Sequence, residues 1–308
     1  MKPAHAFLLA LPLFVSSTSA AVLFSDSFDR ANNRNIDGSI DGIVNNTGTT
    51  LAVDGVYTHP FIDPLNTAAN NYQAQDANPA NGGGAQISGN TLQLATGAGT
   101  SNAFINHNFT NSSITTNGNF TVTVAITGVA GTGTGQGGGF GIGMSLAEAG
   151  ATGDAISGAT KLQDAFVDGT FNGASNVSVA DFWVVLRANS TLAWGGYGNA
   201  ITNATSDVAL FGTAAVAAKT GTISVDFTNV TSFNSGTVVN YAISYNGAPV
   251  TGATGTFSWS EDNANYIGLD GRDGTAVSFN DLSITTVPEP SAALLGLLGL
   301  GGLLRRRR

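Results

Sequence analysis

Residues 120–126 read Phe-Thr-Val-Thr-Val-Ala-Ile (FTVTVAI), with apolar side chains at alternate positions. Successive side chains of a β-strand point to opposite faces of the sheet, so this alternation predicts a strand with one buried face. A second run, Asp181–Arg187 (DFWVVLR), is the most hydrophobic stretch between residues 21 and 286. Its length and β-branched content favour a central strand of a sandwich. Together the two stretches predict an all-β protein.

Short apolar segments recur on both sides of these two stretches, separated by turn sequences such as Gly89-Asn90 and Asn246-Gly247 that favour hairpins. The further segments predicted to be strands or hairpins are residues 22–28, 86–95, 103–109, 140–146, 191–194, 222–227, 238–245, 255–259, 266–269 and 276–284. A weak helical period before residue 292 occurs only in an alanine-rich patch at 208–218. The prediction is therefore a single antiparallel β-sandwich spanning residues 21–286.

Two segments interrupt the pattern. Residues 29–84 are rich in Asn, Asp, Pro and Gly, which favours extended loops with short strands. Residues 128–139 are almost entirely Gly and Thr, and we expect a flexible turn there. Gly133–Gly138 formally matches a dinucleotide-binding fingerprint, but that chemistry needs a helix N-terminus and the following residues indicate a strand.

The charge of the chain excludes one class of partner. Residues 21–286 carry 6 Lys and Arg against 19 Asp and Glu, a net charge of −13. Such a surface repels phosphate backbones, so we expect no nucleic-acid binding. There is no cysteine, and hence neither a disulfide framework nor a thiolate metal site.

Residues 1–20 are typical of a secretory signal peptide. Lys2 precedes an apolar run from Ala6 to Val15, and the segment ends in small residues suited to cleavage after Ala20 or Ala21. The apolar run is too short for a membrane-spanning helix. We therefore expect export through the Sec machinery and removal of the segment by signal peptidase.

The last 22 residues, 287–308, have three ordered parts. Val287–Ser291 contains the triplet Pro288, Glu289 and Pro290; residues 292–304 are uncharged and predict a short hydrophobic helix; Arg305, Arg306, Arg307 and Arg308 follow. A helix of 13 residues spans about 20 Å against a hydrocarbon core of about 30 Å, so the segment predicts only a transient membrane anchor. The arginines favour a cytoplasmic end, which places residues 21–286 outside.

This tail resembles the PEP-CTERM sorting signal of bacterial surface proteins. The resemblance implies that the Pro-Glu-Pro triplet is recognised by an exosortase, a membrane-embedded cysteine protease, and that the tail is removed. A precursor held at the inner membrane would then become a protein of the cell surface or of an exopolysaccharide matrix.

The body resembles the concanavalin A-like (LamG-type) jelly rolls. The resemblance rests on FSDSFDR at 24–30, ISGNTLQL at 87–94 and YIGLDGRDGTAVSFNDLSI at 266–284. It implies a jelly-roll sandwich, and it suggests a structural Ca²⁺ between the first and last strands. The residues matched to that site are Asp29 and Asp281, with Asp26, Asp270 and Asp273 as further oxygen donors.

No catalytic set emerges from the sequence, and we expect a protein that is not an enzyme. Glycosidases of the resembled fold carry Glu-x-Asp-x-Glu on one strand, whereas the three glutamates here, Glu148, Glu261 and Glu289, form no such pattern. His59 and His107 lie near no nucleophile motif, and structural roles are expected for both. An Asp-dependent glycosidase or polysaccharide lyase remains as a third hypothesis.

Carbohydrate binding would use exposed aromatic faces. Trp183 and Trp259 lie in strand patterns and are expected in the core, whereas Trp194 and Tyr197 have glycine neighbours that would leave a ring uncovered for sugar stacking. The leading hypothesis is a structural or interaction protein of the cell surface. A lectin-like module that binds polysaccharide through Trp194 and Tyr197 is the alternative.

Overall fold

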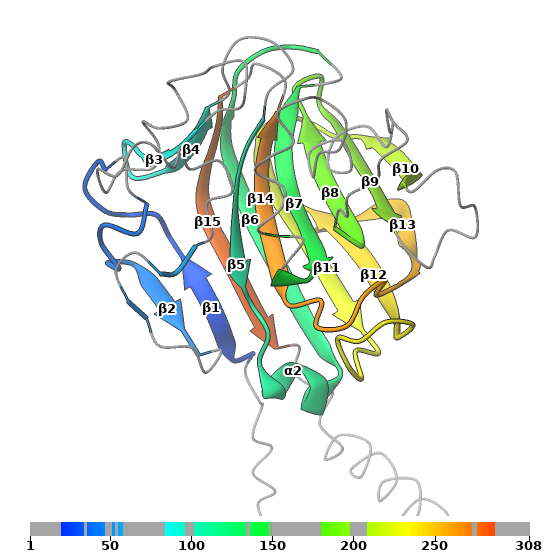
Figure 1. Ribbon diagram of the computed structural model, residues 1–308. Coiled ribbons are helices and arrows are strands. Elements are labelled where there is room, and N and C mark those ends of the chain that lie inside the picture. Colours follow the sequence, from blue (N-terminus) through cyan, green and yellow to red (C-terminus); the bar gives the residue numbers. More distant parts are fainter. Residues whose placement is uncertain are drawn as a thin grey trace, which may run out of the picture.

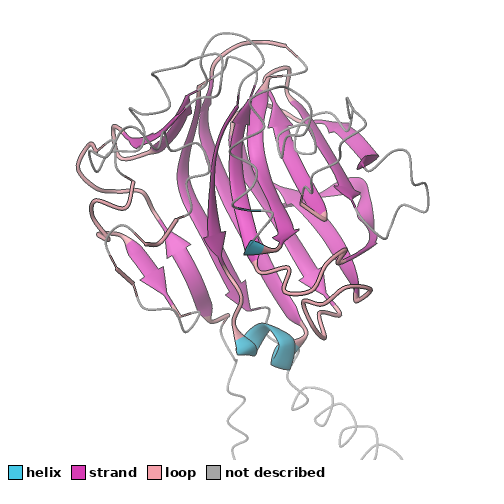
Figure 2. Ribbon diagram, in the orientation of Figure 1, coloured by secondary structure: helices cyan, strands magenta, loops and turns pink. Residues whose placement is uncertain are grey.

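The structure is a computed structural model of the 308-residue chain. The residues it describes are 20–33, 36–46, 51–52, 55–57, 84–95, 102–133, 136–146, 149, 180–197, 208–272 and 276–286. Within these residues the protein is a sandwich of two antiparallel sheets, with one short helix at an end (Figures 1 and 2). The predicted antiparallel all-β sandwich is thereby confirmed.

The larger sheet contains the first and last strands of the body side by side. Its strand order is β13-β12-β11-β6-β15-β1-β2, and the hairpin β3–β4 joins through β15. The strands are β1 (Val22–Asp26), β2 (Ile43–Asn45), β3 (Gly84–Ile87), β4 (Leu92–Ala95), β6 (Asn119–Val129), β11 (Gly221–Thr228), β12 (Val238–Tyr245), β13 (Ala248–Ser258) and β15 (Val277–Thr286). Burial along β6 alternates strictly over residues 119–126, as FTVTVAI predicts.

The second sheet has the order β10-β9-β8-β7-β14-β5. Its strands are β5 (Asn102–Asn108), β7 (Gly137–Met144), β8 (Phe182–Arg187), β9 (Thr191–Tyr197), β10 (Val208–Ala215) and β14 (Tyr266–Arg272). DFWVVLR supplies β8, whose first five residues are all buried. The alanine-rich patch at 208–218 contributes β10 rather than a helix, because its residues pair with β9.

Aromatic side chains fill the space between the sheets. Phe182 of the second sheet contacts Phe227, Tyr241 and Phe257 of the first, with ring centroids 4.8–5.4 Å apart. Rings of this size bury 150–250 Å² each, which supplies a core without disulfides. Trp183 and Trp259 are fully buried, as predicted.

The predicted turn at 128–139 is wrong at both ends, because residues 128–129 belong to β6 and residues 137–139 to β7. Gly137, Gly138 and Gly139 lie inside β7, which pairs with β8 on one side and β14 on the other. A Cβ at Gly139 would overlap the carbonyl oxygen of Val184 on β8. These glycines therefore allow a close approach of strands, and no dinucleotide-binding helix follows them.

The turns predicted from Gly89-Asn90 and Asn246-Gly247 are confirmed. All four residues have positive φ, between 50° and 77°, as a two-residue hairpin turn of the favoured type requires. The helix α2 (Ser112–Asn117) was not predicted. The Asn111 side chain accepts a hydrogen bond from the Ser113 N–H at its start, and Gly118 ends it with φ of 69°.

The two terminal segments lie outside this part of the chain. The signal peptide at 1–20, except Ala20, and the sorting signal at 287–308 with its short hydrophobic helix are not among the described residues. Within the described ranges, no helix has the length and apolar character needed to cross a membrane.

Candidate functional site

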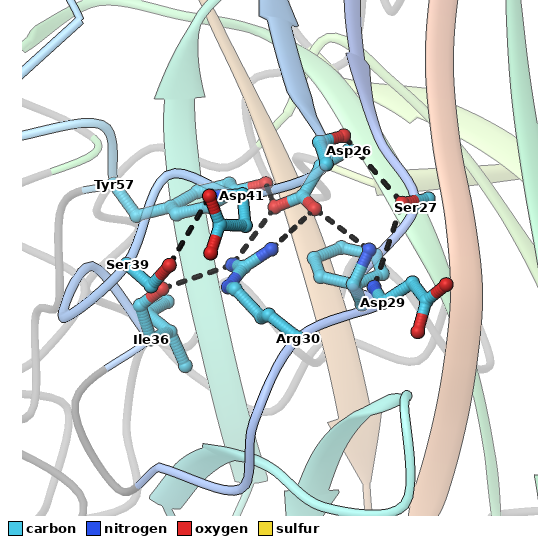
Figure 3. A network of polar contacts seen from close by, with 10 residues as sticks. Asp26, Ser27, Asp29, Arg30, Ile36, Ser39, Asp41 and Tyr57 are labelled. Atoms are coloured by element: carbon cyan, nitrogen blue, oxygen red, sulfur yellow. Dashed lines mark hydrogen bonds and ion pairs between the residues drawn. The ribbon is translucent and has the colours of Figure 1, made fainter.

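A buried polar cluster lies where β1 ends, on the side of the sandwich formed by β1, the loop that follows it and β5 (Figure 3). Its members are Asp26, Arg30, Asp37, Tyr57 and His107, none more than 6% exposed. It is the largest collection of titratable side chains in the described core. These residues therefore form the candidate site for chemistry.

Asp26 is the centre of this cluster. Its carboxylate accepts two hydrogen bonds from the Arg30 guanidinium, at 2.6 and 3.1 Å, and one from the Tyr57 hydroxyl at 2.6 Å. The Phe28 N–H donates a further bond of 2.7 Å to the same carboxylate, which holds Phe28 in a left-handed conformation with φ of 55°. Arg30 also donates to the carbonyl of Ile36 at 2.9 Å. Both charges are thus paired inside the protein.

Two further groups are buried nearby. The Tyr57 hydroxyl has a pKa well above its usual value, because burial and then the Asp26 charge disfavour the phenolate. His107 is stacked on Phe24, with ring centroids 3.8 Å apart, and its Nδ1 lies 2.9 Å from the Val56 carbonyl. Since a carbonyl can only accept, Nδ1 carries the proton and donates.

Burial lowers the pKa of His107 to about 4, so the ring is neutral at pH 7. Its Nε2 is buried and has no hydrogen-bond partner among the described residues. His107 is thus a buried, neutral imidazole. Hydrogen bonds of this cluster attach Arg30 and Tyr57 to Asp26 at the end of β1, and Val56 to His107 on β5. The burial of His107 and its bond to Val56 are in line with the structural role expected for it, and His59 lies outside the described residues.

Of the residues predicted to bind calcium, Asp26 belongs to this cluster, and Asp29 and Asp281 lie near it. β1 and β15 pair as expected, with Asp26 opposite Leu282. Asp29 is exposed, and Figure 3 shows its carboxylate directed away from that of Asp26. Asp281 is half-buried, and burial followed by the Asp26 charge raises its pKa. Asp270 is fully buried in β14, and Asp273 lies outside the described residues.

The described residues contain no group of three His, Cys, Asp or Glu side chains placed to hold a metal ion. A structural Ca²⁺ between the first and last strands stays a prediction.

The expected sugar-stacking face of Trp194 is not found, and that expectation is wrong. Trp194 lies on β9 and is only 2% exposed. A Cβ at Gly212, which is paired with Trp194 on the neighbouring strand β10, would overlap the Trp194 indole. Because glycine has no side chain, the indole can occupy this space. Tyr197 ends β9 opposite Val208, and its side chain is outside the described residues.

The residues of the sorting signal, Pro288, Glu289, Pro290 and Arg305–Arg308, also lie outside the described part. The sequence did not single out Arg30 or Tyr57. The four-residue spacing of Asp26 and Arg30 within FSDSFDR was the only available signal. Tyr57 lies 31 residues from Asp26 in the chain and could not be assigned.

No family model matches the chain, and no curated protein matches it. Among solved structures, it is similar to the endo-1,3-β-glucanase from Streptomyces sioyaensis, with a TM-score of 0.48 and 11% identity over 88% of this chain and 98% of that one. It is also similar to a legume lectin-like domain from Entamoeba histolytica, with a TM-score of 0.40 and 10% identity over 66% of this chain and 87% of that one.

Proposed function

We propose that this chain is an exported protein that its C-terminal segment holds at the inner membrane until an exosortase removes that segment. The released body then acts as a structural or interaction protein of the cell surface or exopolysaccharide matrix. The observation that carries this proposal is the order of parts in residues 287–308: Pro288-Glu289-Pro290, an uncharged run and four arginines.

The boundaries of the folded body support the proposal. The first strand begins at Val22, next to the expected signal-peptide cleavage site, and the last strand ends at Thr286. Removal of residues 1–20 and of the tail therefore leaves every described strand intact. A net charge of −13 on the body also suits a soluble matrix protein that does not bind nucleic acid.

We propose a non-catalytic role for the body. Asp26 is fully buried and paired with Arg30, and Asp37 is also buried. Asp281, whose pKa the Asp26 charge helps to raise, is half-buried. A glycosidase needs two accessible carboxylates that flank the bond to be cleaved. The buried cluster does not meet that requirement, which favours a structural or interaction role over an Asp-dependent glycosidase or lyase.

The mass of the mature protein in its host tests this proposal. We expect the wild type to lose residues 1–20 and everything after the Pro288–Pro290 region, and Glu289→Ala to accumulate as a membrane-bound precursor. Glu261→Ala, which changes an exposed glutamate of the body, is the matched control and should be processed normally. Released wild-type protein that still carries Arg308, or normal processing of Glu289→Ala, would overturn the proposal.

A lectin-like role is the second candidate, and it no longer depends on Trp194. The observation that favours it is a neutral polar depression at one end of the sandwich. Its lining consists mainly of amide and hydroxyl side chains.

A further inference from the structure

A depression of about 520 Å³ is lined in part by residues of α2. Figure 1 shows α2 at one end of the sandwich. Three segments far apart in the chain form its walls: residues 110–115, 231–234 and 263–265. It is separate from the buried Asp26 cluster. Small-molecule sites in proteins have volumes of about 300–1,000 Å³, so its size suits a ligand.

The walls of this depression are uncharged. Its described lining consists of Asn, Ser and Thr side chains with one aromatic ring, that of Phe233. Amides and hydroxyls both donate and accept hydrogen bonds, which matches a ligand covered with hydroxyl groups. The lining thus favours a neutral polyol over an ion.

Three asparagine side chains of the lining have amide groups available to hydrogen-bond a ligand. The side chains of Asn234, Asn263 and Asn265 are exposed or half-buried, and they make no hydrogen bond within the described part of the chain. By contrast, the Asn111 side chain in the same wall is engaged in capping α2. The depression therefore offers three unused amide groups, one from the second segment and two from the third.

The walls are held in place by bonds that do not use these amides. The Phe109 N–H donates to the Asn265 carbonyl at 3.0 Å, and the Ala264 N–H donates to the Phe233 carbonyl at 3.0 Å. The Trp259 indole N–H donates to the Ser232 carbonyl at 2.9 Å, while its ring stacks on Phe233 with centroids 5.5 Å apart. A site already held in shape loses little entropy when a ligand binds.

We propose that this depression binds a short segment of a neutral polysaccharide through the side-chain amides of Asn234, Asn263 and Asn265. The net charge of −13 on the body disfavours an acidic polysaccharide, because like charges repel. The inference rests on the proposed export, since glycans are then the surroundings of the body. The proposal specifies the ligand of the interaction role, a neutral polysaccharide, and the surface that binds it.

Retardation of the full-length protein in non-denaturing gels tests the proposal. The gels contain dextran, laminarin, galactomannan or hydroxyethyl cellulose as neutral probes, or alginate as the acidic probe. We expect at least one neutral polysaccharide to retard the protein and alginate to have no effect. Asn234→Ala/Asn265→Ala should raise the dissociation constant about tenfold, the effect of losing two neutral hydrogen bonds.

Asn240→Ala, an exposed asparagine on β12, is the matched control and should bind as the wild type does. If the double alanine variant does not fold, Asn234→Asp/Asn265→Asp keeps the side-chain shape, removes the donors and should also weaken binding. No retardation by any neutral probe would overturn the proposal, as would unchanged binding by a folded double variant. Neither result affects the test of tail cleavage, which is read from the mass of the mature protein.

Discussion

Ala21 and Thr286, the residues at the two ends of the body, are hydrogen-bonded to each other in both directions. The Thr286 N–H donates to the Ala21 carbonyl at 2.9 Å, and the Ala21 N–H donates to Thr286 Oγ1 at 3.0 Å. Signal-peptide cleavage after Ala20 would preserve both bonds, whereas cleavage after Ala21 would remove both. The pair therefore favours Ala21 as the mature N-terminus.

Thr286→Val should destabilise the protein by about 1 kcal/mol, because it removes the acceptor for the Ala21 N–H without changing the side-chain shape. Urea denaturation of the full-length protein measures this change. Thr285→Val is the control, since the Thr285 hydroxyl makes no hydrogen bond within the described residues. Equal stability of the two variants would show that the contact between the ends contributes nothing.

Arg30→Met should destabilise the protein by about 3–5 kcal/mol, because it leaves the Asp26 carboxylate buried without its counter-charge. In the double variant Asp26→Asn/Arg30→Met the uncompensated charge is gone, and part of the stability should return. Chemical denaturation of Asp26→Asn, Arg30→Met and the double variant gives the coupling energy between the two residues. Lys219→Met, at a half-buried lysine whose ammonium donates a hydrogen bond to the Gly131 carbonyl at the surface, should change stability by about 1 kcal/mol or less. Additive effects of the two single changes would contradict a paired, desolvated site.

Much of the fold could be predicted because its strands have one buried and one solvated face. Residues 119–126 and 238–245 show that alternation in both sequence and burial. The first three residues of β7, Gly137–Gly139, were not predicted as strand, because glycine has no side chain that could show an alternating pattern. What these glycines do, which is to allow close approach of neighbouring strands, cannot be seen in the local sequence. The six-residue helix α2 is too short for a period to emerge.

The candidate site was harder to predict for a related reason. Whether Trp194 is exposed depends on Gly212, a residue on another strand, so its own glycine neighbours were misleading. The partners of Asp26 include Tyr57, which comes from a long polar loop with no periodic signal. The walls of the polar depression come from the start of α2 and from two loops far from it in the chain. Local patterns identify strands, but they do not show which loops meet.

Gly139→Ala should destabilise the protein by about 3 kcal/mol, at the upper end of the usual cost of overpacking. Its new Cβ would overlap the Val184 carbonyl, and β7 cannot move away because it is paired on both sides. Gly128→Ala is the control: its Cβ would lie 3.3 Å from Ser278 Oγ, on a side chain that can rotate. Thermal denaturation compares the two, and a similar loss from both would refute the close-approach explanation.

His107 should make the stability of the protein depend on pH between about 6.5 and 4. Burial lowers its pKa to about 4 in the folded state, against an ordinary value of 6.5. Between these values the unfolded chain binds a proton that the folded protein does not, so stability falls as the pH falls. The shift corresponds to about 3 kcal/mol.

His107→Asn retains a donor for the Val56 carbonyl and removes the titration. Urea denaturation at pH 7, 5.5 and 4 should show the wild type losing about 3 kcal/mol more than this variant, while other groups contribute equally to both. Parallel pH profiles would mean that the folded protein protonates His107 as readily as the unfolded chain does. The ring would then have access to water, and the cluster at the end of β1 would not be sealed.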